Sequence, residues 1–304
     1  MEPLTALEVL AQRPADLPAP LAAFVLTSTF VFSLCWGSFL NVVIARVPAG
    51  VSVVRPRSHC PTCGQQISGF DNIPVLSWLA LRGRCRMCKA AISPRYPVVE
   101  LLIGLAGLAC VVRFGVTIEA VELFAFIAIL TAISFIDVDT WTVPHPMWIA
   151  LIASGLLFAA IEARIADDAS VLIDRVIGGV GAALLLAAVV VTATAALRKL
   201  GRIPPGETAM GWGDPLILAG IGSYLGYRTL PLVLFLSSVQ GAAVGVVLWK
   251  LGKLRGDAPV SQEDDWTPPK GALPFGPFLA LGALEVAFFG DAMLAHLVPL
   301  LRAE

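Results

Sequence analysis

The chain has 304 residues, of which 57% are hydrophobic and 14% are charged, and its formal net charge is -1. Soluble domains carry about 25% charged residues, so this chain has too little polar surface to cover itself in water. The composition excludes an ordinary water-soluble protein and predicts an all-α polytopic membrane protein.

Eight apolar runs are candidates for membrane-spanning helices, each of which needs about 20 residues. The runs cover residues 20–45, 98–114, 119–136, 145–161, 176–197, 214–228, 229–249 and 273–301. The second and sixth are short. Gly178, Gly179 and Gly181 in the fifth run would let helix backbones approach closely. We expect residues 1–45 to form an N-terminal segment and the first spanning helix.

The connection after the first run is strongly basic. Its charged residues are Arg46, Arg55, Arg57, Arg82, Arg84, Arg86, Lys89 and Arg95, against Asp71 alone. Basic connections face the cytoplasm, and the acidic connection at 162–175 then faces outside. Alternation of eight spans places the end of the third and the start of the sixth at the cytoplasmic face.

Two Cys-x-x-Cys motifs lie in this basic connection. Their cysteines are Cys60, Cys63, Cys85 and Cys88, with roughly 20 residues between the two motifs, a spacing typical of a four-thiolate zinc site. The alternatives are a pair of disulfides, which a reducing cytoplasm disfavours, and four thiols that bind nothing. Four thiolates leave no open coordination position, so we expect a structural Zn²⁺ and a small cytoplasmic zinc-binding domain at residues 46–97.

Two aspartates are predicted to lie at the same membrane depth, although they are distant in sequence. Asp137 ends the third apolar run, and Asp214 follows Gly211-Trp212-Gly213 at the start of the sixth. Two carboxyl groups in one low-dielectric site cannot both ionise cheaply, so one keeps its proton. The ionised group can then activate water while the protonated group polarises a carbonyl. Proton or ion transport uses the same residue types and remains an alternative.

Several segments resemble the type IV prepilin peptidase family, which contains bacterial enzymes with leader peptidase and N-methyltransferase activities. The segments that carry the resemblance are Gly37 to Ile44, the two Cys-x-x-Cys motifs, Ile92 to Glu100, Ile136-Asp137 with Pro144 seven residues on, and Ala209 to Asp214. Their order and spacing make the resemblance specific, and together they cover most of the chain.

The resemblance implies that Asp137 and Asp214 are the catalytic pair of an aspartic protease core at residues 98–304. It implies cleavage of a prepilin or pseudopilin after the glycine that ends a basic leader, in the bacterial cytoplasmic (inner) membrane. Methylation of the new N-terminus would use S-adenosylmethionine, for which the sequence has no recognisable binding motif. Asn41, Arg95, Glu100, Gly211 and Gly213 are possible substrate or cofactor contacts.

The sequence departs from the family pattern at two positions. Leu216 stands where the family commonly has a lysine after the second aspartate, and His145 stands where an acid commonly follows the proline. A non-catalytic protein that binds pilin-like helices is therefore an alternative function. Nucleic-acid binding is not expected, because the basic residues flank a metal site beside a membrane, where orientation and lipid headgroups explain them.

Overall fold

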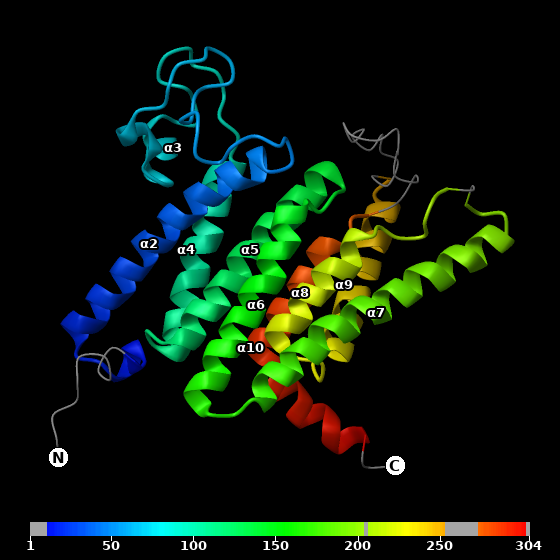
Figure 1. The fold of residues 1–304 in the computed structure, drawn as a ribbon. Coiled ribbons are helices and arrows are strands. Elements are labelled where there is room, and N and C mark those ends of the chain that lie inside the picture. The colour runs from blue at the N-terminus through cyan, green and yellow to red at the C-terminus, as the bar shows by residue number, and fades with distance from the viewer. Residues whose placement is uncertain (1–10, 204–205, 253–272, 302–304) are drawn as a thin grey trace, which may run out of the picture. The chain divides into compact units, whose positions relative to one another are not determined.

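The computed structural model describes residues 11–203, 206–252 and 273–301, and the chain forms two compact units, residues 1–128 and 129–304 (Figure 1). Over the described residues, all regular elements are helices, apart from two isolated β-bridges in the cysteine-containing loop. The predicted all-α architecture is confirmed.

In the part of the chain that the structure describes, six helices are long and apolar enough to cross a membrane. They are α2 (Ala19–Arg46), α4 (Arg95–Phe114), α5 (Ile118–Thr140), α6 (His145–Ala166), α7 (Ser170–Lys199) and α9 (Leu230–Lys250). The protein is therefore a multi-pass membrane protein.

Helices also occupy the other two predicted runs, but they do not establish two further spans. Helix α8 (Gly213–Leu225) has 13 residues, a length of about 20 Å against a hydrocarbon core of about 30 Å. Helix α10 runs over Gly276–Leu301, and the apolar stretch found among its described side chains, Gly276–Gly290, has fewer residues than a span needs. The number of eight spans stays a prediction.

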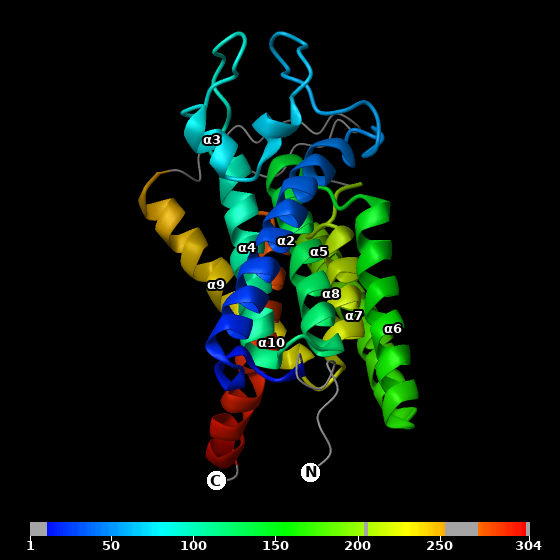
Figure 2. The ribbon, with the colours of Figure 1, turned by 90° about the vertical axis from the view of Figure 1, so that its left-hand side faces the viewer.

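The first unit is built on the antiparallel pair α2 and α4, which lie side by side in both views (Figures 1 and 2). The backbones approach closely at Gly37, where an added Cβ would lie 2.8 Å from the Cα of Glu100. The loop between the two helices contains two short helices, η2 (Gly69–Asn72) and α3 (Leu76–Ala80). This unit also contains η1 (Pro14–Asp16) and the first part of α5.

The second unit encloses α8. Helices α6, α7 and α10 pack against it, and ten of its residues, from Asp214 to Tyr224, are buried. The backbones of α7 and α8 almost touch at Gly178 and Gly222, where a Cβ on either glycine would lie within 2.5 Å of the other residue's carbonyl oxygen. Helix α8 therefore contacts protein on all sides rather than lipid.

Candidate active site and metal centre

Asp137 lies in the last turn of α5. Its side chain is 6% exposed, and the helix ends three residues later, where Trp141 adopts a left-handed conformation with φ 57°. The backbone N–H of Trp141 donates to the carbonyl oxygen of Asp137 at 2.9 Å. The helix end therefore places a buried carboxyl group beside a turn of the chain.

The first residue of α10 holds this carboxyl group. The backbone N–H of Gly276 donates to Oδ2 of Asp137 at 3.1 Å, in a buried hydrogen bond. An added Cβ at Gly276 would lie 2.5 Å from that same oxygen and 3.0 Å from Cδ1 of Ile217. Only glycine therefore allows the backbone to come this close to the carboxylate.

Asp214 is the second residue of α8 and is 7% exposed. It lies near enough to Asp137 for the two carboxyl groups to interact electrostatically. Ile217 of the same helix borders the same site, because a Cβ added at Gly276 would lie 3.0 Å from its Cδ1. The N-terminus of a helix favours negative charge, so α8 places Asp214 where an anion can be stabilised. The structure brings the two predicted aspartates together.

The two glycines beside Trp212 have different surroundings. An added Cβ at Gly213 would lie 2.6 Å from Cγ2 of Val143, in the turn between α5 and α6. At Gly211 the nearest atom would be Oδ2 of Asp214, at 3.9 Å, which is ordinary contact. The lack of a side chain at Gly213 therefore lets the backbone before Asp214 pack closely against the turn that follows Asp137. At Gly211, by contrast, there is room for a side chain beside the carboxylate of Asp214.

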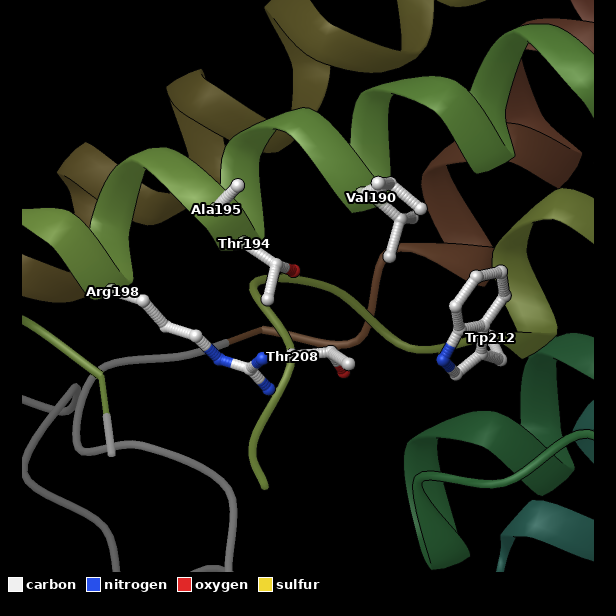
Figure 3. Close-up of a pocket in the computed structure, with 7 residues that line it drawn as sticks. Val190, Thr194, Ala195, Arg198, Thr208 and Trp212 are labelled. Carbon is white, nitrogen blue, oxygen red and sulfur yellow. The ribbon is translucent and has the colours of Figure 1, made fainter. Parts of the chain in front are cut away.

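A shallow groove of about 340 Å³ lies between α7 and the segment that leads to Asp214 (Figure 3). Its lining residues are Val190, Val191, Thr194, Ala195, Arg198, Thr208 and Trp212. Among the described residues that line it there is no carboxylate to accept the ribose hydroxyls of S-adenosylmethionine, and the charged side chain, Arg198, is a cation like the sulfonium of that ligand. The described lining of the groove therefore does not fit the methyl donor.

Three of the predicted contact residues belong to the first unit. Glu100 is buried, and its Oε2 accepts the backbone N–H of Val75 at 2.7 Å, while Ser38 also hydrogen-bonds to its side chain. Nδ2 of Asn41 donates to the carbonyl oxygen of Tyr96 at 3.1 Å. These bonds join α2, α4 and the intervening loop, so both side chains have structural partners. Arg95 is the first residue of α4.

The four cysteines converge at one point of the loop. Their Sγ atoms all lie within 4.8 Å of one another, and those of Cys60 and Cys88 are 3.7 Å apart. Four sulfurs at 2.3 Å from a tetrahedral zinc would be about 3.8 Å apart. None of the four forms a disulfide. The cluster has the ligands and the size for a metal ion.

The two halves of the cluster share one backbone design. In each, the first cysteine is flanked by an isolated β-bridge, and its carbonyl oxygen accepts the N–H of the residue four positions on, Gly64 or Lys89. Those two residues have φ values of 70° and 62°, so each turn reverses the chain through a left-handed residue. Gly64, directly after the second cysteine of the first motif, therefore closes a tight turn.

The thiols are arranged to favour a bound cation. The backbone N–H groups of Cys63 and Thr62 hydrogen-bond to the sulfur of Cys60 and lower the pKa of this thiol to about 6. The N–H of Ala90 acts in the same direction on Cys88, but burial and the neighbouring thiols raise its pKa to about 11. Negative charges on neighbouring thiolates repel one another, so four thiolates at this separation are stable only with a positive ion between them.

Comparison with known proteins finds family models that match two successive parts of the chain. A family model described as the bacterial peptidase A24 N-terminal domain matches residues 31–114, and one described as the type IV leader peptidase family matches residues 124–246. A relative from Myxococcus xanthus (strain DK1622), named prepilin leader peptidase/N-methyltransferase, is 36% identical over 94% of this chain and 96% of its own length.

The chain belongs to the type IV leader peptidase family.

Two further relatives with the same name support the membership of this leader peptidase family. One from Aeromonas hydrophila is 35% identical over 87% of this chain and 90% of its own length. One from Stutzerimonas stutzeri is 34% identical over 98% of this chain and its full length. No solved structure matches the chain. The resemblance predicted from the sequence motifs is therefore confirmed.

The site of this leader peptidase family member also contains a residue that the sequence motifs did not indicate. Gly276 holds Asp137, yet it lies beyond both matched segments. The only signal was local: Gly276 stands before Pro277 at the start of an apolar run, a place where a glycine can permit close backbone approach.

Proposed function

We propose that this protein is an intramembrane aspartic endopeptidase that removes the basic leader from type IV prepilin-like substrates and then N-methylates the new N-terminus. The observation that carries the proposal is the buried pair Asp137 and Asp214 in a chain of the type IV leader peptidase family. Buried acids within membrane helices are costly and mark functional sites.

In the proposed reaction one carboxyl group is ionised and the other is protonated. The ionised group takes a proton from water, whose oxygen attacks the scissile carbonyl carbon, while the protonated group donates a hydrogen bond to the carbonyl oxygen. The C–N bond then breaks, and a proton passes to the leaving nitrogen. The products are a leader with a new carboxylate and a mature chain with a free amine.

The hydrogen bond from Gly276 fixes the carboxyl group of Asp137 before substrate arrives. Such preorganisation avoids reorientation during the reaction. S-adenosylmethionine, when bound, supplies the methyl group for the new amine. The described residues that line the groove beside Trp212 do not fit it, so we assign no residue to that group.

We further propose that the protein lies in the bacterial inner membrane with the cysteine cluster and both aspartates at the cytoplasmic side. The support is the excess of arginine and lysine in the loop between α2 and α4. The cluster would hold a structural Zn²⁺, because all four ligands come from the protein. A cytoplasmic basic leader and a bilayer-embedded apolar helix would place the scissile bond between the two environments.

The test is co-expression of a prepilin-like substrate with wild type, Asp137→Asn, Asp214→Asn and Asp139→Asn, followed by mass spectrometry of the substrate. Asp139 is an exposed carboxylate two residues from Asp137 and serves as the matched control. We expect processing by wild type and Asp139→Asn, and none by the other two variants. A mass increase of one methyl group on the mature chain would establish the second activity. Processing that persists in Asp137→Asn and Asp214→Asn would refute the aspartic mechanism.

A further inference from the structure

A row of large apolar side chains is exposed on the loop between α2 and α4. Phe70 is 85% exposed, Ile73 44%, Leu76 64% and Leu79 58%. They follow one another at intervals of three residues through η2 and α3, and Leu76 and Leu79 lie on the same side of α3. We refer to these four residues as the apolar stripe.

The opposite side of α3 is fixed to the rest of the loop. Nε1 of Trp78 donates to the carbonyl oxygen of Ile92 at 3.1 Å, and its ring packs against Gly83. Asp71 in η2 accepts two hydrogen bonds from Nε and one from Nη2 of Arg86, at 2.6 to 3.0 Å, from the turn between Cys85 and Cys88. Because the inner side is tied at these points, the stripe has a fixed outward direction.

The start of α3 is tied to α4 at a defined height. Val75 has φ 60° and ψ -51°, a strained conformation for a β-branched residue, and its N–H donates to the buried carboxylate of Glu100. Glu100 is the sixth residue of α4, so it lies about 7 to 8 Å beyond the beginning of that helix. Strain that the surroundings maintain is typical of functional segments.

This height is that of a membrane interface. Helix α4 has 20 residues, which matches a hydrocarbon core of about 30 Å. Interfacial helices bury their apolar side about 5 to 10 Å into the boundary between headgroups and acyl chains. Both views show α3 beside the beginning of α4, while the two cysteine turns extend away from the helices (Figures 1 and 2).

The charges around the stripe complement anionic headgroups. Arg82 and Arg84 follow α3 directly and are exposed. Asp71 is the only acid in residues 46–97, and it is already paired with Arg86. A lipid surface with anionic headgroups therefore meets apolar side chains and cations together, as an interfacial anchor requires.

We propose that η2 and α3 form an interfacial anchor, in which the apolar stripe inserts into the headgroup region of an anionic bilayer beside α4. Glu100 acts as the positioning residue, because it holds the strained turn at Val75 that sets the depth of α3. The cysteine-containing loop is thereby docked to the membrane at a point of its own, in addition to its attachment through α2 and α4.

Photo-crosslinking in full-length protein tests the anchor. Phe70 or Leu79 is replaced by p-benzoylphenylalanine, and the protein is reconstituted in vesicles of phosphatidylethanolamine and phosphatidylglycerol. Met87 is the matched control position, since it is 66% exposed but lies in a cysteine turn. Metal content and elution profile confirm that each variant is folded. Two positions of the apolar stripe are tested separately, so that the experiment still gives a result if one variant does not fold.

We expect phospholipid adducts at positions 70 and 79 in at least several-fold higher yield than at position 87, with phosphatidylglycerol enriched relative to the vesicle. The enrichment should disappear in the double variant Arg82→Gln, Arg84→Gln. Crosslinks to peptides from residues 129–304 or to a second copy of the chain would overturn the proposal, as would equal lipid labelling at position 87. An unchanged phosphatidylglycerol fraction in the double variant would contradict the role of charge.

Discussion

The backbone N–H of Gly276 and the carboxylate of Asp137 form a hydrogen bond of 3.1 Å across 139 positions of sequence. This bond makes the first residue of α10 part of the candidate active site. Since the donor is backbone, no side chain at position 276 could replace it, and the absence of a Cβ is what permits it.

The first prediction concerns Gly276→Ala. The new methyl group would meet Oδ2 of Asp137 at 2.5 Å, so the carboxylate has to move, and a displacement of about 1 Å can cost about a hundredfold in rate. We expect leader cleavage to fall by that order. Gly181→Ala in α7 is the control, because nothing lies within 4 Å of a Cβ there. Cleavage rates of purified variants in one detergent measure the difference, and an unimpaired Gly276→Ala would show that Asp137 needs no such support.

The second prediction separates the glycines on either side of Trp212. Gly213→Ala would place its methyl group 2.6 Å from Val143, whereas Gly211→Ala makes only an ordinary contact. Overpacking of this kind costs roughly 1–3 kcal/mol. We therefore expect a lower unfolding temperature and slower cleavage for Gly213→Ala, and near wild-type behaviour for Gly211→Ala. Equal effects of the two substitutions would mean that contact with Val143 does not position Asp214.

The third prediction concerns the metal. Cys60→Ser removes one of four ligands, and structural zinc contributes directly to folding free energy. We expect zinc measured by elemental mass spectrometry to fall well below one ion per chain, and the loop at 51–94 to become more sensitive to protease. Cys35→Ser, which alters an exposed cysteine outside the cluster, should keep its metal. Full zinc content in Cys60→Ser would exclude the four-cysteine site.

The fourth prediction is a pH dependence of the cysteine-containing loop. The guanidinium of Arg86 hydrogen-bonds to Asp71 and holds the pKa of this carboxyl group below its ordinary value of 3.8. A lowered pKa in the folded state means that the pair stabilises the loop fully above pH 3.8 and ceases to do so as the pH falls through the lowered pKa.

We therefore expect hydrogen exchange in residues 69–88, corrected for intrinsic rates, to increase below about pH 4. In Asp71→Asn the exchange should already be faster at neutral pH, and the acid-dependent step should be absent from this segment. An acid response that is the same in wild type and in Asp71→Asn would assign it to other groups.

The positions of the helices and the pairing of the aspartates could be predicted because they depend on patterns within the sequence. Apolar runs predicted the eight longer helices that the structure describes, and charge bias in the loops predicted that Asp137 and Asp214 lie at one depth. The length of α8 was less predictable. The apolar run continues to residue 228, but Gly226 adopts φ 75° and its N–H bonds to Gly222, so the helix ends at Leu225.

The partners of Glu100 and Asp137 could not be predicted, because each carboxylate accepts a hydrogen bond from a backbone N–H group. The carboxylate of Glu100 hydrogen-bonds to the backbone of Val75 and to Ser38. Backbone donors have no residue type that a sequence pattern could indicate, and their position depends on how the whole chain folds.

The enclosure of α8 decides how the surrounding membrane can affect catalysis. Thickness of the bilayer acts on lipid-facing helices by tilting them, and α8 is covered by α6, α7 and α10. Changes in acyl-chain length reach Asp214 only through movements of those neighbours, foremost α7, whose backbone touches α8 at Gly178. The proposed catalytic carboxylate is thus buffered against lipid variation, and cells that remodel their membranes would retain the geometry of the candidate site.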